Sequence, residues 1–123
     1  MRMFPFALAI AATGLLAACE QQGTRRPGDV TQSDVDAGLR IISTDPTRRQ
    51  GLVHQCRADA RMQSRQDTAN MAALMKVTPA QVPVVFCDRL LKGLESGRIT
   101  AADLNTVGRG VITPAVLAVI QGE

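Results

Sequence analysis

The chain of 123 residues has no tryptophan and no tyrosine, and its only aromatic side chains are three phenylalanines. Recognition by aromatic stacking, which single-stranded nucleic-acid binders use, is therefore not expected. The formal net charge is only +3, from 14 basic and 11 acidic residues. This excess is too small for the dense basic surface of a nucleic-acid binder, so we expect no nucleic-acid partner. The length leaves room for one small domain.

Motifs for catalysis and metal binding are also missing from the sequence. His54 is the only histidine, so no second one can complete a familiar zinc set, and there is no Cys-x-x-Cys pair for thiol exchange or haem attachment. The chain also lacks a Gly-x-Ser-x-Gly elbow, a His-Glu-x-x-His helix and a glycine-rich phosphate loop. We therefore expect no metal, no cofactor and no enzymatic activity. An enzyme whose site is assembled from distant residues stays an alternative.

Long apolar runs are confined to the N-terminus. The run from Phe4 to Ala18 is 15 residues long, which is shorter than the ~20 residues that a membrane-spanning helix needs. Arg2 precedes the run, and small residues end it. A short basic start, an apolar middle and small residues before a cleavage site are typical of a secretory signal. Residues 1–18 are therefore predicted to be a signal peptide.

The end of this apolar run reads Leu16-Ala17-Ala18-Cys19, which resembles the lipobox of bacterial lipoproteins. The resemblance covers about the first 20 residues and no part of the mature domain. It implies that the chain is cut before Cys19 and that a diacylglycerol is attached to the Cys19 sulfur. Two or three acyl chains would anchor the protein to a membrane that it does not span. The alternative is an ordinary secretory signal cut after Ala18, with Cys19 a free or disulfide-bonded thiol.

The resemblance also implies a location in the bacterial cell envelope. Glu20, rather than Asp, follows Cys19. Among enterobacterial lipoproteins an Asp there favours the inner membrane, so the outer membrane is the expected location. Residues 19–29 carry no apolar side chain after Cys19 except Pro27, and are expected to form a flexible tether. Ten such residues would reach roughly 18 Å by coil scaling.

A recurring local pattern predicts the helices of the mature domain. A β-branched apolar residue and a threonine are followed, four positions after the threonine, by another apolar residue at Thr31, Thr78, Thr100 and Thr113. Threonine is a good helix N-cap, and the flanking apolar pair forms a hydrophobic staple. Asp45-Pro46 marks another start, and a further short helix is expected from Asp67 or Thr68. With no alternating strand pattern, residues 30–123 are predicted to be a single all-α domain, a small bundle of about five to six short helices.

Two cysteines remain once Cys19 is assigned to the lipid. Cys56 and Cys87 lie 31 positions apart on the apolar faces of predicted helices. An even pair in an oxidising compartment favours a disulfide, with Cα atoms within about 7 Å of each other. A metal site and a redox-active thiol pair are the alternatives.

Basic side chains form a stripe in the second predicted helix. Arg57, Arg61 and Arg65 recur every four residues, and His54 lies one turn before Arg57. A solvated helix face is one interpretation. The other is a contact for anionic lipid head groups or an acidic envelope partner, because each basic residue adds about 1 kcal/mol near an anionic surface.

The sequence as a whole predicts a membrane-anchored lipoprotein on the periplasmic side, acting by surface contacts as an accessory or structural envelope factor. The expected partner is then another envelope protein. The sequence does not indicate the oligomeric state of the chain. The alternative is a small ligand-binding protein or inhibitor with a pocket between helices. A deep pocket with polar lining would favour the ligand-binding protein or an enzyme, and a closed core would favour the accessory factor.

Overall fold

A computed structural model describes residues 26–123, and this part of the chain contains six α-helices, one 3₁₀ helix and no strand. The all-α prediction is confirmed. The elements are α1 (Gln32–Thr44), α2 (Pro46–Arg61), α3 (Arg65–Met75), η2 (Pro79–Gln81), α4 (Val82–Glu95), α5 (Ala101–Gly108) and α6 (Pro114–Gln121). The predicted signal peptide, residues 1–18, and Cys19 lie outside the described residues.

Side-chain caps begin most of the helices, as the sequence pattern predicts. Predicted starts that carry a side-chain cap are Thr31, Asp45, Thr100 and Thr113. At α5 the cap is reciprocal, because the Asp103 N–H donates to the Thr100 hydroxyl while the Asp103 carboxylate accepts from the Thr100 N–H at 2.9 Å. Each cap satisfies an N–H group that the first helical turn leaves without a partner.

The predicted start at Thr78 leads first into the 3₁₀ helix η2. The Thr78 N–H donates to Gln81 Oε1 at 2.9 Å, and α4 begins one residue later, at Val82. Pro83 occupies the first turn of α4, where a missing N–H leaves no intrahelical bond unmade. Pro83 is therefore accommodated without interrupting α4.

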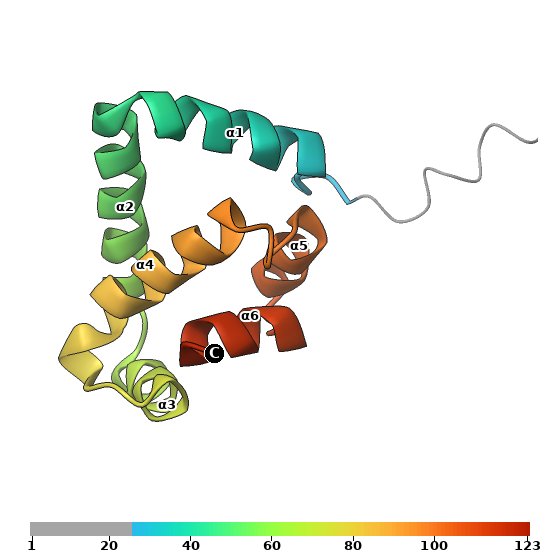
Figure 1. Cartoon of the computed structure of the whole chain (residues 1–123). Coiled ribbons are helices and arrows are strands. Elements are labelled where there is room, and N and C mark those ends of the chain that lie inside the picture. The colour runs from blue at the N-terminus through green and yellow to red at the C-terminus, as the bar shows by residue number, and fades with distance from the viewer. Residues whose placement is uncertain (1–25) are drawn as a thin grey trace, which may run out of the picture.

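Helix α4 is the centre of the domain and lies between α2 and α6 (Figure 1). Helix α1 crosses one end of this arrangement and contacts both α2 and α5. The main buried cluster joins residues of α3, α4 and α6 with Ile99, which precedes α5: Ala72, Met75, Val82, Ile99, Val116, Val119 and Ile120. The last helix, α6, therefore packs into the core through Val116, Val119 and Ile120.

Gly93 allows the close approach of α4 to α6. A Cβ atom at this position would lie 2.7 Å from Ile99 Cδ1 and 2.8 Å from Val119 Cγ1. These distances are below any normal carbon contact, and both neighbours are buried. Only glycine therefore fits here without a shift of the core.

Arg89 of α4 forms hydrogen bonds to the C-terminal ends of α3 and α6. Its Nη1 atom donates to the Met75 carbonyl of α3 at 3.4 Å and to the Ile120 carbonyl of α6. A cation is favourable at the C-terminal end of a helix, where carbonyl groups lack intrahelical partners. The half-buried guanidinium thus holds α3 and α6 against α4.

The residues before α1 are fixed to α5. Val30 exchanges two hydrogen bonds of 2.9 Å with the Asn105 side chain, and Arg109 forms an ion pair with Asp29 at 3.1 Å. Asp29, predicted to be the last residue of a flexible tether, is therefore bound to the domain. Among the described residues, no helix combines the length and the apolar character that crossing a membrane requires.

Candidate functional site: an apolar groove beside the disulfide

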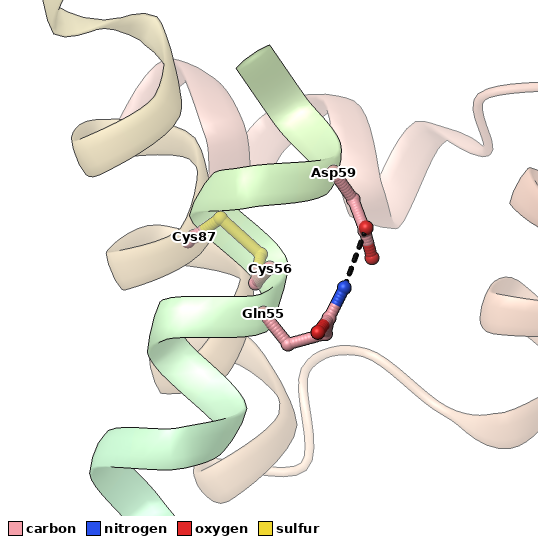
Figure 2. The surroundings of a disulfide bond; sticks show 4 residues. All are labelled: Gln55, Cys56, Asp59 and Cys87. Carbon is pink, nitrogen blue, oxygen red and sulfur yellow. Dashed lines mark hydrogen bonds between the residues drawn. A yellow bond between two sulfur atoms is a disulfide. The ribbon is translucent and has the colours of Figure 1, made fainter. Parts of the chain in front are cut away.

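Cys56 of α2 and Cys87 of α4 are joined by a disulfide, with their Cα atoms 6.0 Å apart. The predicted pairing is confirmed, and Figure 2 shows the bond crossing from one helix to the other. An ion pair between Arg49 and Glu95 joins the same two helices at a second point. The hydrogen bond to the Glu95 carboxylate raises the pKa of Arg49 above its ordinary value. These two links hold α2 at the side of α4.

An open groove of about 600 Å³ lies next to this link, between α2, α4 and α6. Its floor is a row of half-buried side chains on α4, Phe86, Leu90 and Leu94, which recur every four residues and so share one helix face. The buried side chains of Val116 and Ile120 on α6 line the opposite wall.

Apolar side chains also reach the mouth of the groove. Leu52 of α2 is 49% exposed, and Ile112 of the loop before α6 is 43% exposed, although both line the groove. Apolar side chains that gather in a concavity and stay in contact with water make this groove the candidate binding site. The groove is open and apolar, so it is neither a closed core nor a deep polar pocket, the two arrangements that would separate the functional alternatives.

The rim on the α2 and α3 side is polar and carries two carboxylates, Asp59 and Asp67. Gln55 Nε2 donates to Asp59 Oδ1 at 2.8 Å, and both side chains lie on the same side of α2 (Figure 2). The Ser64 hydroxyl donates to Asp67 at 2.6 Å. Neither carboxylate forms an ion pair within residues 26–123. This part of the rim is therefore negatively charged.

The loop that carries Ile112 is positioned by Asp103. The Asp103 carboxylate accepts hydrogen bonds from the Thr100 N–H at 2.9 Å and from the Thr113 hydroxyl at 2.7 Å. The Thr100 backbone bond first, and the Thr113 bond second, lower the pKa of Asp103 below its ordinary value. One carboxylate thus links the first turns of α5 and α6, and the loop between them forms one edge of the groove.

The prediction that the basic residues form a stripe on one face of a single helix is wrong. Helix α2 ends at Arg61, and Arg65 begins α3. His54 and Arg61 are exposed on α2, but Arg57 is half-buried, and its Nε atom is enclosed without a hydrogen-bond partner in the described part of the chain. Arg57 is therefore partly a packing residue, and none of the four basic residues lines the groove.

A capping motif explains this break. The Ser64 side chain accepts a hydrogen bond from the Asp67 N–H, so a new helix starts one residue after Ser64. The Ser-x-x-Asp spacing is visible in the sequence. It overrides the four-residue arginine spacing because the N-cap residue Ser64 has an extended backbone, which interrupts the helical run before α3 begins.

Residues 26–123 contain no group of three or more His, Cys, Asp or Glu side chains placed to hold a metal ion. The groove is thus a site of apolar contact with an acidic edge. Comparison of the chain with family models, with curated proteins and with solved structures finds no match.

Proposed function

We propose that the protein is a non-enzymatic lipoprotein of the bacterial cell envelope, and that its helical domain acts by binding a partner in the apolar groove. The observation that carries the proposal is the groove itself, with the exposed side chains of Leu52 and Ile112 at its mouth. Burying such side chains releases about 25 cal/mol for each Å² of apolar surface removed from water. The groove therefore offers a partner more binding energy than the surrounding polar surface.

The disulfide supports the envelope location. Disulfides persist in the periplasm and at the cell surface, whereas reducing systems keep cytosolic thiols free. The Cys56–Cys87 bond agrees with the export that the N-terminal apolar run predicts. Lipid attached to Cys19 would then hold the domain at the membrane, with the outer membrane preferred because Glu20 follows the cysteine. The basic side chains of His54 and Arg61 would face anionic head groups or an acidic envelope protein.

The anchor is tested by replacing Cys19 with serine in the full-length gene. Cys19→Ser should lose the lipid and should either leave the membrane fraction or accumulate with its signal peptide uncut. Gln21→Ser is the matched control, because it changes a neighbouring residue without touching the acceptor sulfur. Membrane fractionation and the mass of the mature N-terminus report the outcome. A Cys19→Ser protein that is normally cut and still membrane-bound would refute the lipid anchor.

A small apolar ligand is the second candidate for the groove. Its volume of about 600 Å³ falls within the range of roughly 300 to 1,000 Å³ that is typical of small-molecule sites. Native mass spectrometry of the protein purified from membranes would detect such a ligand as a fixed added mass.

A further inference from the structure

The groove is apolar in its floor but negatively charged at one edge, and this combination restricts what can occupy it. We infer that its occupant is an amphipathic α-helix of another protein that carries lysine or arginine beside its apolar face. The inference rests on the proposed binding function and names the class of partner.

The floor of the groove fits a helix. Phe86, Leu90 and Leu94 form a row of side chains spaced by four residues, and such rows pack against the side-chain rows of a second helix. The row runs over nine residues of α4, and its two ends are about 12 Å apart at a rise of 1.5 Å per residue. A partner segment of about three turns would cover it, with apolar side chains at i, i+3, i+4 and i+7.

The rim selects the charge of that helix. Asp59 and Asp67 lie at the groove edge, without an ion pair in residues 26–123. A partner with basic flanks would place its cations next to these carboxylates. A partner with acidic flanks would meet like charge at short range, which is unfavourable wherever water is partly excluded.

The same rim disfavours a lipid. An acyl chain could fill the apolar floor, but its carboxylate or phosphate head group would lie near Asp59 and Asp67. Within the described part of the chain, no lysine, arginine or histidine lines the groove to pair with such a head group. The charges at the mouth therefore favour a cationic helix over a fatty acid or phospholipid.

Two synthetic peptides of about 14 residues test the inference. Both have leucines on one helix face, and the flanking positions are lysine in one peptide and glutamate in the other. The mature full-length protein is held in phosphatidylcholine nanodiscs, and binding of each labelled peptide is followed by fluorescence anisotropy, with empty nanodiscs subtracted. The lysine peptide should bind at least about tenfold more tightly than the glutamate peptide.

Paired variants locate the binding. Leu52→Glu should abolish binding, whereas Ile41→Glu should not, because Ile41 is similarly exposed at 45% but lies on α1 outside the groove. The double variant Asp59→Asn/Asp67→Asn should weaken binding of the lysine peptide about three- to tenfold. Asp36→Asn is the charge control. Asp36 lies outside the groove and accepts a hydrogen bond from the Gln32 side chain, just as Asp59 accepts one from the Gln55 side chain. Thermal unfolding confirms that each variant is folded, and Ile112→Glu replaces Leu52→Glu if that variant is not.

Several outcomes would overturn the inference. Equal binding of both peptides removes the role of the acidic rim, and binding that survives Leu52→Glu and Ile112→Glu places the peptide outside the groove. Displacement of the lysine peptide by palmitate at lower concentration than by unlabelled peptide assigns the site to lipid. A concentration-dependent dimer lost in Leu52→Glu assigns it to a second copy of the chain. Peptide binding can be measured without the lipid anchor. If the Cys19→Ser experiment shows that the protein is not anchored, the same peptide titration is made with the protein free in buffer.

Discussion

Opening the Cys56–Cys87 bond should remove a large part of the free energy of unfolding. The bond links residues 31 positions apart. In the chain-entropy model a cross-link of this span destabilises the unfolded state by about 3.7 kcal/mol at 25 °C. Domains of this size have a total stability of about 5 to 15 kcal/mol. Reduction should therefore leave a folded but markedly less stable domain.

Urea unfolding of the oxidised protein, the reduced protein and a Cys56→Ala/Cys87→Ala variant separates the contributions. Reduction keeps both sulfur atoms, so it isolates the effect of the cross-link. The alanine variant also removes the sulfur of Cys87, which is only 2% exposed, and should lose somewhat more. The slope of stability against urea should rise on reduction, because an unlinked unfolded chain exposes more surface.

The control is the alanine variant with and without reductant, whose unfolding should not change. A loss below about 1 kcal/mol on reduction, with an unchanged slope, would refute the reasoning, because the bond would then not restrict the unfolded chain. Detection of free Cys56 and Cys87 thiols in non-reduced peptides of the purified protein would refute the pairing itself.

Two further stability measurements test the packing and the electrostatics. Gly93→Ala should be less stable than Gly51→Ala by about 1 to 3 kcal/mol, since both gain helix propensity but only the first forces a Cβ atom against Ile99 and Val119; equal urea midpoints would contradict the close contact. Asp103→Asn should be less stable than the wild type at neutral pH. Because the folded-state pKa of Asp103 is lowered below its ordinary 3.8, this difference should be full above about pH 4 and disappear as the pH falls further. A difference that stays constant from pH 6 to pH 2 would show that the charge of Asp103 does not matter.

The features that could be predicted from sequence are those that depend on local chemistry. Thr31, Thr100 and Thr113 begin helices because a hydroxyl cap and its partner N–H lie within three residues of each other. The cysteine pair could be predicted because Cys56 and Cys87 remain once Cys19 is assigned to the lipid, and because the N-terminal apolar run predicts export to an oxidising compartment.

The groove could not be predicted in the same way. The sequence places Leu52, Cys56 and Ala60 on one apolar face of a helix, but it does not tell which part of that face another helix covers. In the fold, Cys56 contacts α4 through the disulfide, while Leu52 stays 49% exposed. That difference depends on how α2 and α4 pack against each other, which is a property of the tertiary structure. The bonds between Val30 and Asn105 are equally hidden, because the residues are 75 positions apart.

The attachment of Val30 and Asp29 to α5 determines how the domain would respond to mechanical load. A pull on the chain ahead of Asp29 is transmitted to Asn105 and Arg109 before it reaches α1. The first turn of α1 is also held to α5, since the Ala101 N–H donates to Gln32 Oε1 at 2.9 Å. The hydrogen bonds of Val30 and Gln32 and the ion pair of Asp29 all join the same two segments, so they would share the load. They would therefore have to break together rather than one after another. A domain pulled from its N-terminal end would therefore keep α1 in place until this attachment fails.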